Sequence, residues 1–437
     1  MIGYSESLPG RNAGPVTAAE RLPALDALRG VAVMGILVMN VYAFAMPFAA
    51  YYNPLIMGGT DALNMGTWFF THLFFDQKFM SIFSMLYGAG VVMMMNRAAA
   101  RGTPFTPIFY RRSAWLLVIG LLHGYFIWFG DILFHYALMG MLVFLFRKAS
   151  PRTLIAIACF VLPVTLLINY GSSFHLEELQ ADVAAIEAEQ AQGATLEEEQ
   201  REKLEEWRDI RPLFAPSEDD IAADVTAYRG SYVDVLTHRA PFVAFMQVSG
   251  TLVFVLWRVG GLMLLGMALM KLGVLSGERS TRFYRKMTVF GYGLGLPLAI
   301  LSAVILEAQQ FDPIYVARYG GIPNYFGSIM VAFGHIGAVM LVVKSGAFQA
   351  AVARCAAVGR MALSNYLAQS LVMTSLFYGY GVGLYAEVPR FAQQGFVVIL
   401  LGLQLLLSTW WLRHFRFGPA EWLWRSLTYG QRQPMRR

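Results

Sequence analysis

Charged residues are scarce in this 437-residue chain. Asp, Glu, Lys and Arg make up 14% of it, and 57% of the residues are hydrophobic. A soluble globular protein averages about 25% charged residues, so the composition excludes an ordinary soluble enzyme. Acidic residues are scarcer still outside one segment, because 17 of the 28 lie in 171–240. The mean hydropathy of +0.50 agrees with a chain that lies in a lipid bilayer.

Cysteine is almost absent, since the chain contains only Cys159 and Cys355. Two cysteines in or beside apolar stretches exclude a disulfide framework and a cysteine metal cluster. Metal-ligand spacings, phosphate loops and a nucleophilic serine elbow are also missing. The net charge of +6 does not indicate a nucleic-acid partner, because the basic residues lie between apolar stretches rather than on one face. We expect no bound metal, no tightly bound cofactor and no nucleic acid.

Long charge-poor runs dominate what is present. An apolar helix needs about 20 residues to cross a bilayer, with a range of roughly 17 to 25. The runs predict an all-α, polytopic integral membrane protein with about ten transmembrane helices, at 27–46, 67–96, 113–130, 132–147, 152–170, 245–270, 287–306, 325–343, 361–380 and 393–412.

The distribution of Lys and Arg predicts the orientation, because these residues concentrate in cytoplasmic loops. When both termini are placed in the cytoplasm, every basic loop falls on that side of a bacterial inner (plasma) membrane. The predicted parts are a cytoplasmic N-terminal segment (1–26), transmembrane helices 1–5 (27–170), an acidic extracytoplasmic insert (171–240), transmembrane helices 6–10 (241–412) and a basic cytoplasmic tail (413–437).

The acidic insert carries 17 acidic and 6 basic residues, a net charge of −11. Apolar residues recur at helical spacing between Leu176 and Trp207, which predicts an amphipathic helix pair broken near Gly193. Two interpretations stay open. The insert is either a helical cap over the outer face or a solvated charged loop.

Ionisable side chains inside a bilayer are costly, so they face the bundle interior and mark substrate paths or catalytic groups. The candidates are Asp26, Arg29, His72, Asp76, Lys78, His123, Asp131, His135, Arg258 and His335.

A tight hairpin is predicted between Arg112 and Arg147, because the 34 residues between them leave about 17 for each of two spans. At its tip, Asp131 and His135 are four residues apart and would share a helix face. A carboxylate beside an imidazole fixes the ring tautomer and makes a general-base pair. Asp131 is equally well placed to be the N-cap of the second helix.

His123 lies eleven residues beyond Arg112, which is about 16 Å along a helix. A histidine at that depth needs a partner, and it is either a structural residue or a catalytic base.

The other polar positions favour structural roles. His72 and Asp76 stand four apart and precede Lys78, a spacing that favours a salt-bridged cluster over a short acyltransferase motif. His335 is expected to be a packed histidine, and Arg258 is expected to neutralise an acidic neighbour.

Several strings are specific enough to indicate a family. They are LDALRGVA (25–32) with Asn40, IFSMLYGAG (82–90), His123-Gly124 with GDIL (130–133), GRMALSNYL (359–367) with Gln369-Ser370, and EWLWR (421–425). Together they resemble the YeiB-like membrane proteins, a family that carries domain of unknown function 418.

That family is similar in fold to the transmembrane acyltransferases, which include the family-three acyltransferases and the lysosomal heparan N-acetyltransferase. The resemblance implies transfer of an acyl group, often from cytoplasmic acyl-CoA, to an acceptor across the membrane. In the family-three group, ten residues separate the opening arginine from a catalytic histidine. Counted from Arg29, that position here is Asn40. The heparan enzyme's group resembles this chain in having an asparagine there, so another histidine would have to act.

These observations favour a membrane-embedded acyltransferase that moves an acyl group from acyl-CoA, a co-substrate, to an extracytoplasmic glycan, lipid or small-molecule acceptor. A proton-coupled small-molecule transporter is the alternative, because buried His and Asp also form proton relays. A structural partner-binding protein is third, and it would not need so many buried ionisable groups. No pattern assigns an oligomeric state. The expected roles are phosphate binding for Arg29 and Arg112, proton transfer for His123, Asp131 and His135, and carbonyl polarisation for Asn40.

The predicted topology can be tested with reporter fusions at Gln190 and after Arg437. We expect the two reporters to give opposite compartments, because the insert and the C-terminus lie on opposite sides of the membrane. The same compartment for both would contradict ten spans.

Overall fold

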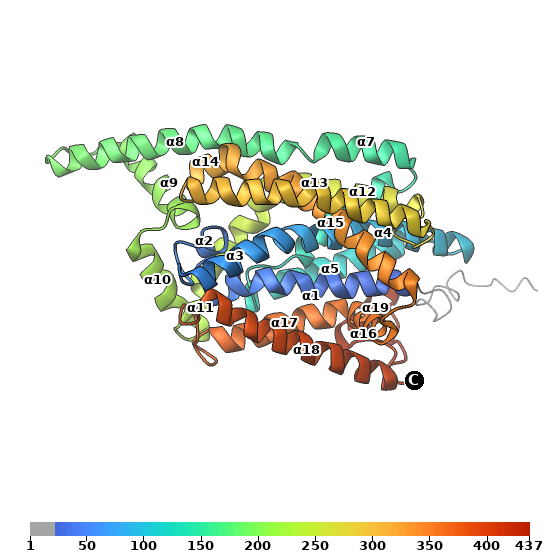
Figure 1. Ribbon diagram of the computed structural model, residues 1–437. Coiled ribbons are helices and arrows are strands. Elements are labelled where there is room, and N and C mark those ends of the chain that lie inside the picture. Colours follow the sequence, from blue (N-terminus) through green and yellow to red (C-terminus); the bar gives the residue numbers. More distant parts are fainter. Residues whose placement is uncertain (1–21) are drawn as a thin grey trace, which may run out of the picture.

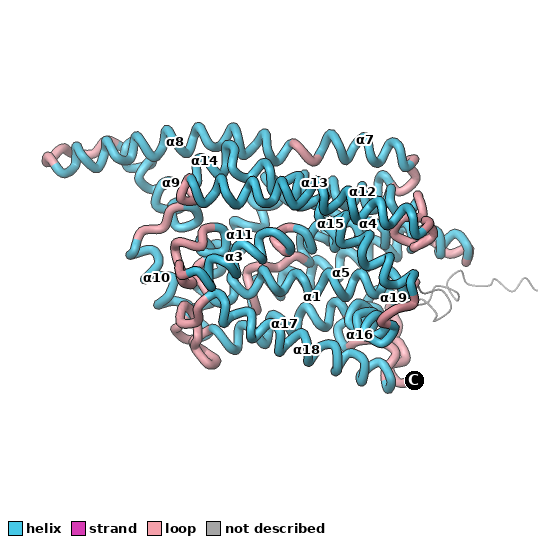
Figure 2. The backbone as a smooth tube through the Cα atoms, viewed as in Figure 1, coloured by secondary structure: helices cyan, strands magenta, loops and turns pink. Residues whose placement is uncertain are grey.

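The computed structural model describes residues 22–437, and within that range it is helical, with no β-strand beyond one isolated bridge between Phe415 and Arg436 (Figures 1 and 2). The α-helices are α1 (Pro23–Ala45), α2 (Phe48–Tyr52), α3 (Ala62–Phe74), α4 (Lys78–Ala100), α5 (Phe105–Phe126), α6 (Leu133–Val143), α7 (Pro151–Val161), α8 (Val164–Ala191), α9 (Glu198–Phe214), α10 (Glu218–Tyr228), α11 (Tyr232–Phe245), α12 (Gly260–Lys271), α13 (Thr281–Ala308), α14 (Pro313–Tyr315), α15 (Gly321–Ser345), α16 (Gln349–Arg360), α17 (Ala362–Phe377), α18 (Arg390–His414) and α19 (Pro419–Tyr429). A short 3₁₀ turn, η2 (Phe144–Phe146), and two π-helical segments, η3 (Met246–Val259) and η4 (Val316–Gly320), join them.

Seven helical stretches in the described part are long and apolar enough to cross a membrane, which confirms an all-α polytopic membrane protein. They are Pro23–Ala45, Ala62–Ala100, Pro151–Ala191, Tyr232–Lys271, Thr281–Ala308, Pro313–Ser345 and Arg390–His414. The other three predicted spans fall on α5, α6 and α17. The count of ten stays a prediction.

Span two differs from its prediction as a single helix. The chain breaks between α3 and α4, where Gln77 adopts a left-handed φ of 61°. Average hydropathy does not reveal such a break, because apolar stretches on both sides outweigh the short polar run Asp76-Gln77-Lys78.

The acidic insert is helical, and its first helix continues from the membrane region. Figure 1 shows α8 extending past the ends of its neighbours, without a break at the predicted boundary at Gly171. The chain turns at Gly193, where the pattern predicts the break, and α9 packs back against α8. At the opposite end of the bundle lie α16, α19 and the C-terminus (Figure 1).

Helix α1 is central, since it packs against α4, α15, α16, α17 and α18. Fifteen of its 23 residues are buried. Helix α1 therefore lies between α4, from the first half of the chain, and α15 to α18, from the second half.

An ion pair holds the insert helices α9 and α10 together. Nε and Nη2 of Arg211 donate to the two carboxylate oxygens of Asp220 at 2.8 and 2.9 Å. Burial alone would raise the pKa of Asp220, but hydrogen bonds from Arg211 and Ser217 outweigh it and hold the pKa below the usual 3.8.

Acidification is expected to loosen this contact. A carboxylate whose pKa is lower in the folded state contributes stability above its unfolded pKa, and this is lost as the pH falls through the folded pKa. Hydrogen-exchange protection of α10, corrected for intrinsic rates, should fall about two- to fivefold between about pH 6 and pH 3. In Asp220→Asn the hydrogen-exchange protection of α10 should be lower at both pH values and should not fall between them. Equal pH responses would contradict the assignment.

Candidate functional site

A buried hydrogen-bonded pair, His123 and Asp131, lies where α5 and α6 are joined. Nδ1 of His123 is 2.9 Å from Oδ1 of Asp131, and only 1% of His123 is exposed. An ionised carboxylate can only accept, so a neutral imidazole beside one carries its proton on Nδ1 and leaves Nε2 as an acceptor. The fold thus brings together two of the three residues predicted to transfer protons.

The second ring nitrogen of His123 contacts a serine that was not among the predicted site residues. Nε2 lies 2.9 Å from Oγ of Ser370 on α17, a residue 247 positions away. Because Nε2 is an acceptor in this tautomer, the hydroxyl donates. Two signals were available in the sequence. Gln369-Ser370 is one of the strings that indicate the family, and Asn365, Gln369 and Ser370 form a run of polar residues within an apolar helix.

Asp131 lies one residue before Ile132, the N-cap of α6, and its side chain makes a capping hydrogen bond to the first turn of that helix. Its Oδ2 accepts a 2.7 Å hydrogen bond from the backbone N–H of Phe134, at the start of α6. One carboxylate therefore begins α6 and orients His123 at the same time.

His135 does not pair with the Asp131 carboxylate, so the predicted Asp131–His135 base pair is wrong. Its ring nitrogens lie 3.1 Å from the carbonyl oxygen of Asp131 and 3.2 Å from that of Met246. The carboxylate turns toward α5 because it bonds His123 and caps α6. His135 instead ties α6 to η3.

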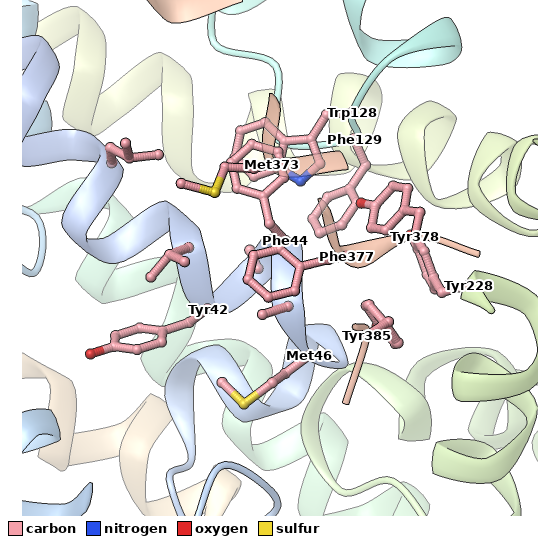
Figure 3. Packing of buried hydrophobic residues seen from close by; sticks show 14 of the residues in the cluster. Tyr42, Phe44, Met46, Trp128, Phe129, Tyr228, Met373, Phe377, Tyr378 and Tyr385 are labelled. Atoms are coloured by element: carbon pink, nitrogen blue, oxygen red, sulfur yellow. The ribbon is translucent and has the colours of Figure 1, made fainter. Parts of the chain in front are cut away.

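The loop that carries Asp131 is packed inside the protein. Trp128 stacks on Phe44 of α1 with ring centroids 3.9 Å apart, and Figure 3 shows Phe129 beside Tyr378 in the same apolar cluster. This packing fixes the loop between α5 and α6.

The end of α5 is held by α11. The guanidinium of Arg239 donates to the carbonyl oxygens of Ile127 and Tyr125 at 2.5 and 2.7 Å. The hydroxyl of Tyr232 donates to the carbonyl of Phe126 at 2.8 Å. These carbonyls end a helix and have no partner within it, so a cation there is favourable.

A cavity of about 270 Å³ lies at the other end of α5, where α1 begins and α19 packs. Arginines outnumber carboxylates six to two in its wall, and the charged residues are Asp26, Arg29, Arg97, Arg112, Arg360, Arg416, Glu421 and Arg425.

Arg29 and Arg112, the residues predicted to bind donor phosphates, both line this cavity. Nη1 of Arg29 lies 3.1 Å from Oδ1 of Asp26. The guanidinium of Arg112 lies 3.5 Å from the ring centre of Trp424, whose Nε1 donates to the carbonyl of Arg112.

Two glycines bring α1 and α16 together beside the cavity. A Cβ atom at Gly30 would overlap the carbonyl of Cys355, and one at Gly359 would overlap the carbonyl of Asp26. Both glycines belong to the specific strings found in the sequence, and the close approach places Arg360 in the same wall as Arg29.

Tyr366 belongs to the wall of the cavity and packs beside the ring of His123. Its hydroxyl donates to the carbonyl of Gly130 at 3.0 Å and accepts from the N–H of Ile132 at 3.3 Å. Its ring centroid is 5.1 Å from that of His123. The cavity and the His123 pair are therefore separated by one side chain.

Glu421 of α19 caps the start of α17. Its Oε1 accepts from the backbone N–H groups of Leu363 and Ser364 at 2.7 and 3.1 Å. Burial raises the pKa of Glu421, and the bonds from Ser364 and Leu363 offset part of that rise. A carboxylate at a helix N-terminus is the favourable charge there.

Asn40 lies half-buried on α1, one turn before Phe44. In the described residues it does not line the cavity, and no hydrogen bond joins it to His123 or Asp131. Its predicted role in the site gains no support from contacts.

A second buried polar cluster occupies the break between α3 and α4. Nδ1 of His72 is 3.4 Å from Oδ2 of Asp76. The side chain of Asn324 bridges Asp76 and Lys78, donating to the carboxylate and accepting from Nζ at 2.7 Å each. This agrees with a structural cluster, in which Asn324 joins the predicted partners.

Arg258 makes its hydrogen bonds with neutral groups, while Asp76 acts on it electrostatically without a direct ion pair, so its neutralisation of an acidic neighbour stays a prediction. The fully buried guanidinium donates to the carbonyl of Tyr325 and to the hydroxyls of Ser81 and Ser328. It also lies 4.2 Å from the ring centre of Tyr325.

His335 is packed and hydrogen-bonded on both sides, as expected of a structural residue. Its Nδ1 is 2.8 Å from the hydroxyl of Tyr292, and its Nε2 is 2.9 Å from the carbonyl of Phe74. Throughout residues 22–437, no three His, Cys, Asp or Glu side chains gather as a metal ion would require.

These features define an all-α integral membrane protein with a buried Ser–His–Asp chain beside an arginine-lined cavity. The profile of the family described as "Protein of unknown function (DUF418)" matches residues 269–431. The chain is 31% identical to "Uncharacterized protein YxaH" of Bacillus subtilis (strain 168), over 96% of this chain and 97% of that protein. It is 30% identical to "Uncharacterized protein YeiB" of Escherichia coli (strain K12), over 94% and 96%. The chain therefore belongs to the DUF418 family, which confirms the resemblance to the YeiB-like proteins.

Loss of the Arg239 cap is expected to destabilise the protein. Arg239→Ala leaves two buried carbonyls without their donors, and each charged hydrogen bond contributes about 1.5–3 kcal/mol. We expect a loss of about 3 kcal/mol or more, measured by unfolding in detergent. The matched control is Arg201→Ala, an exposed insert arginine paired with Glu198, which should change stability by less than about 0.5 kcal/mol. Equal effects would contradict the capping role.

Proposed function

We propose that this protein is a membrane acyltransferase whose donor, an acyl-CoA, binds in the arginine-lined cavity. The observation that carries the proposal is the position of the cavity. Its inner end is one side chain, Tyr366, away from a histidine held in an acceptor tautomer. A donor with phosphates at one end and a thioester at the other would span these two features.

The electrostatics of the cavity support a polyanionic ligand. Arg29, Arg112 and Arg416 belong to its wall together with three further arginines, and only two carboxylates oppose them. Guanidinium groups bind phosphate through paired hydrogen bonds. The interior is apolar by contrast, with Val33, Ile36, Phe83 and Leu86 along it, which suits the uncharged arm of such a donor.

The acceptor would meet the acyl group at His123. The imidazole takes the proton from the acceptor hydroxyl or amine through Nε2, while Asp131 stabilises the imidazolium that forms. Both groups are removed from water, which strengthens this electrostatic effect. His135 and Asn40 are not needed for this step.

The charge distribution supports an orientation for the reaction. The cavity end carries the basic residues of the tail and of the loops, so it would face the cytoplasm of a bacterial inner membrane. The acidic insert, at the opposite end of the bundle (Figure 1), would face the extracytoplasmic acceptor.

A proton-coupled transporter is the second candidate, and the cluster at the α3–α4 break favours it. Lys78 and Arg258 are ionisable groups buried between helices, and the partly buried Asp76 lies beside them, as in a proton relay. Uptake into proteoliposomes with an imposed pH gradient would distinguish it from acyl transfer.

Acyl transfer is tested by release of thiol from labelled acyl-CoA by the purified chain in detergent. His123→Ala should lower the rate by about 10²- to 10⁴-fold. Asp131→Asn should lower it similarly, because an amide donates to Nδ1 and so leaves the proton on Nε2. His135→Ala is the matched control and should retain most activity in the folded fraction. Full turnover by His123→Ala would refute its role as the base, and an inactive wild type would favour the transporter.

A further inference from the structure

We propose that Ser370 is a nucleophile that carries the acyl group as a covalent ester between donor and acceptor. This inference rests on the proposed acyl transfer and adds a second chemical step to it. It follows from a three-residue hydrogen-bonded chain, Ser370 to His123 to Asp131, with both contacts at 2.9 Å.

The direction of these bonds suits activation of a serine. Asp131 fixes the proton of His123 on Nδ1, so the hydroxyl of Ser370 points its own proton at Nε2. A serine hydroxyl is a weak nucleophile until an adjacent base can take that proton. The same relation of roles occurs in serine hydrolases on unrelated folds, where it is recognised by geometry and not by sequence position.

The Ser370 hydroxyl has only one proton, and its other acceptor is farther away. The carbonyl of Tyr366 lies at 3.3 Å, against 2.9 Å for Nε2. The competing bond is the ordinary back-bond of a serine in a helix. The ordinary back-bond explains the longer contact with the Tyr366 carbonyl, but it does not explain the shorter contact with the imidazole of His123.

The chain offers a matched comparison in Ser408. This serine is also 1% exposed and lies on a neighbouring helix, α18, but its partner is the side chain of Asn365. An amide cannot take a proton at neutral pH. Ser408 is therefore a buried serine of the same environment without a base.

The cavity leads toward Ser370 along two helices. On α17, Leu363 and Tyr366 line the cavity, and Ser370 follows one turn farther on the same face. On α5, Leu116 lines the cavity and His123 lies two turns farther. A thioester at the inner end of the cavity would reach Ser370 when the Tyr366 ring turns aside.

The chemistry balances in two steps. Oγ of Ser370 attacks the thioester carbon as its proton passes to Nε2 of His123, the C–S bond breaks, and the leaving thiolate takes that proton and departs as a thiol. The acceptor hydroxyl or amine then attacks the ester carbon and gives its proton to Nε2. The bond to Oγ breaks, and His123 returns the proton to Ser370.

A covalent intermediate also accounts for transfer between two sides of a membrane. The donor can leave its cavity before the acceptor arrives, so the two substrates need not occupy the buried site together. The acyl group alone has to pass Tyr366.

The test uses the full chain in detergent with two reagents, diisopropyl fluorophosphate and isotope-labelled acyl-CoA. Peptide mass spectrometry should locate the organophosphate adduct and a burst of acyl ester on Ser370. Ser370→Ala should show neither, His123→Ala should label at least about 10²-fold more slowly, and Ser408→Ala should label like wild type.

A second variant keeps the inference testable if Ser370→Ala does not fold. In Ser370→Cys the acyl adduct should become a thioester, which neutral hydroxylamine releases while it leaves the wild-type ester intact.

The outcomes separate this inference from the proposed function. Turnover of acyl-CoA by folded wild type without any adduct on Ser370 would overturn the nucleophile and leave acyl transfer standing. An organophosphate adduct on Ser370 without acyl-CoA turnover would support the activation of Ser370 and contradict the proposal that acyl-CoA is the donor. If the folded wild type shows neither an adduct on Ser370 nor acyl-CoA turnover, both the nucleophile and the proposed acyl transfer are contradicted.

Discussion

The carboxylate of Asp131 is the constraint on which the rest of the site depends. One oxygen accepts from the backbone N–H of Phe134 in the first turn of α6, and the other bonds His123. Inside an apolar bundle an unpaired N–H or imidazole is costly, so neither bond can be given up to improve the other. The orientation of His123, and through it the contact with Ser370, is therefore set by the folding of the α5–α6 hairpin before any substrate arrives.

Charges from distant segments hold the two helices that meet at this site. Glu421 lies at the N-terminus of α17, and Arg239 lies at the C-terminus of α5. Each sign matches the partial charge of the helix end that it contacts. The tail positions one reacting helix and the insert positions the other, so the geometry of the site depends on parts of the chain that lie outside its core.

Hydropathy and charge spacing predicted the membrane class and the α5–α6 hairpin, because these properties depend on residues close in sequence. They also selected Arg29 and Arg112, which share a cavity. Ser370 could not be predicted, because its contact with His123 depends on how α5 and α17 are rotated and packed. The capping role of Arg239 was not predicted, because Arg239 lies in the segment that was interpreted as a charged insert. The break at Gln77 was not predicted, because the apolar stretches before Asp76 and after Lys78 dominate the average hydropathy. The sequence left two roles open for Asp131, a helix cap and the partner of a histidine. Its carboxylate has both roles, because one oxygen bonds the start of α6 and the other bonds His123.

The three donated bonds from Tyr232 and Arg239 to the end of α5 divide the insert into two parts with different tolerance to change. Helix α9 packs on α8 and α2 and could be shortened, exchanged between relatives or used to carry a fused domain. The end of α10 and the stretch from Tyr232 onward belong structurally to the helix bundle, because Asp224 accepts from the hydroxyl of Tyr385 and Tyr228 packs in the same apolar cluster as Trp128. A graft or deletion that crosses Tyr232 would open the end of α5, and one that removes Tyr228 would open the apolar cluster, whereas one confined to α9 leaves the bundle closed.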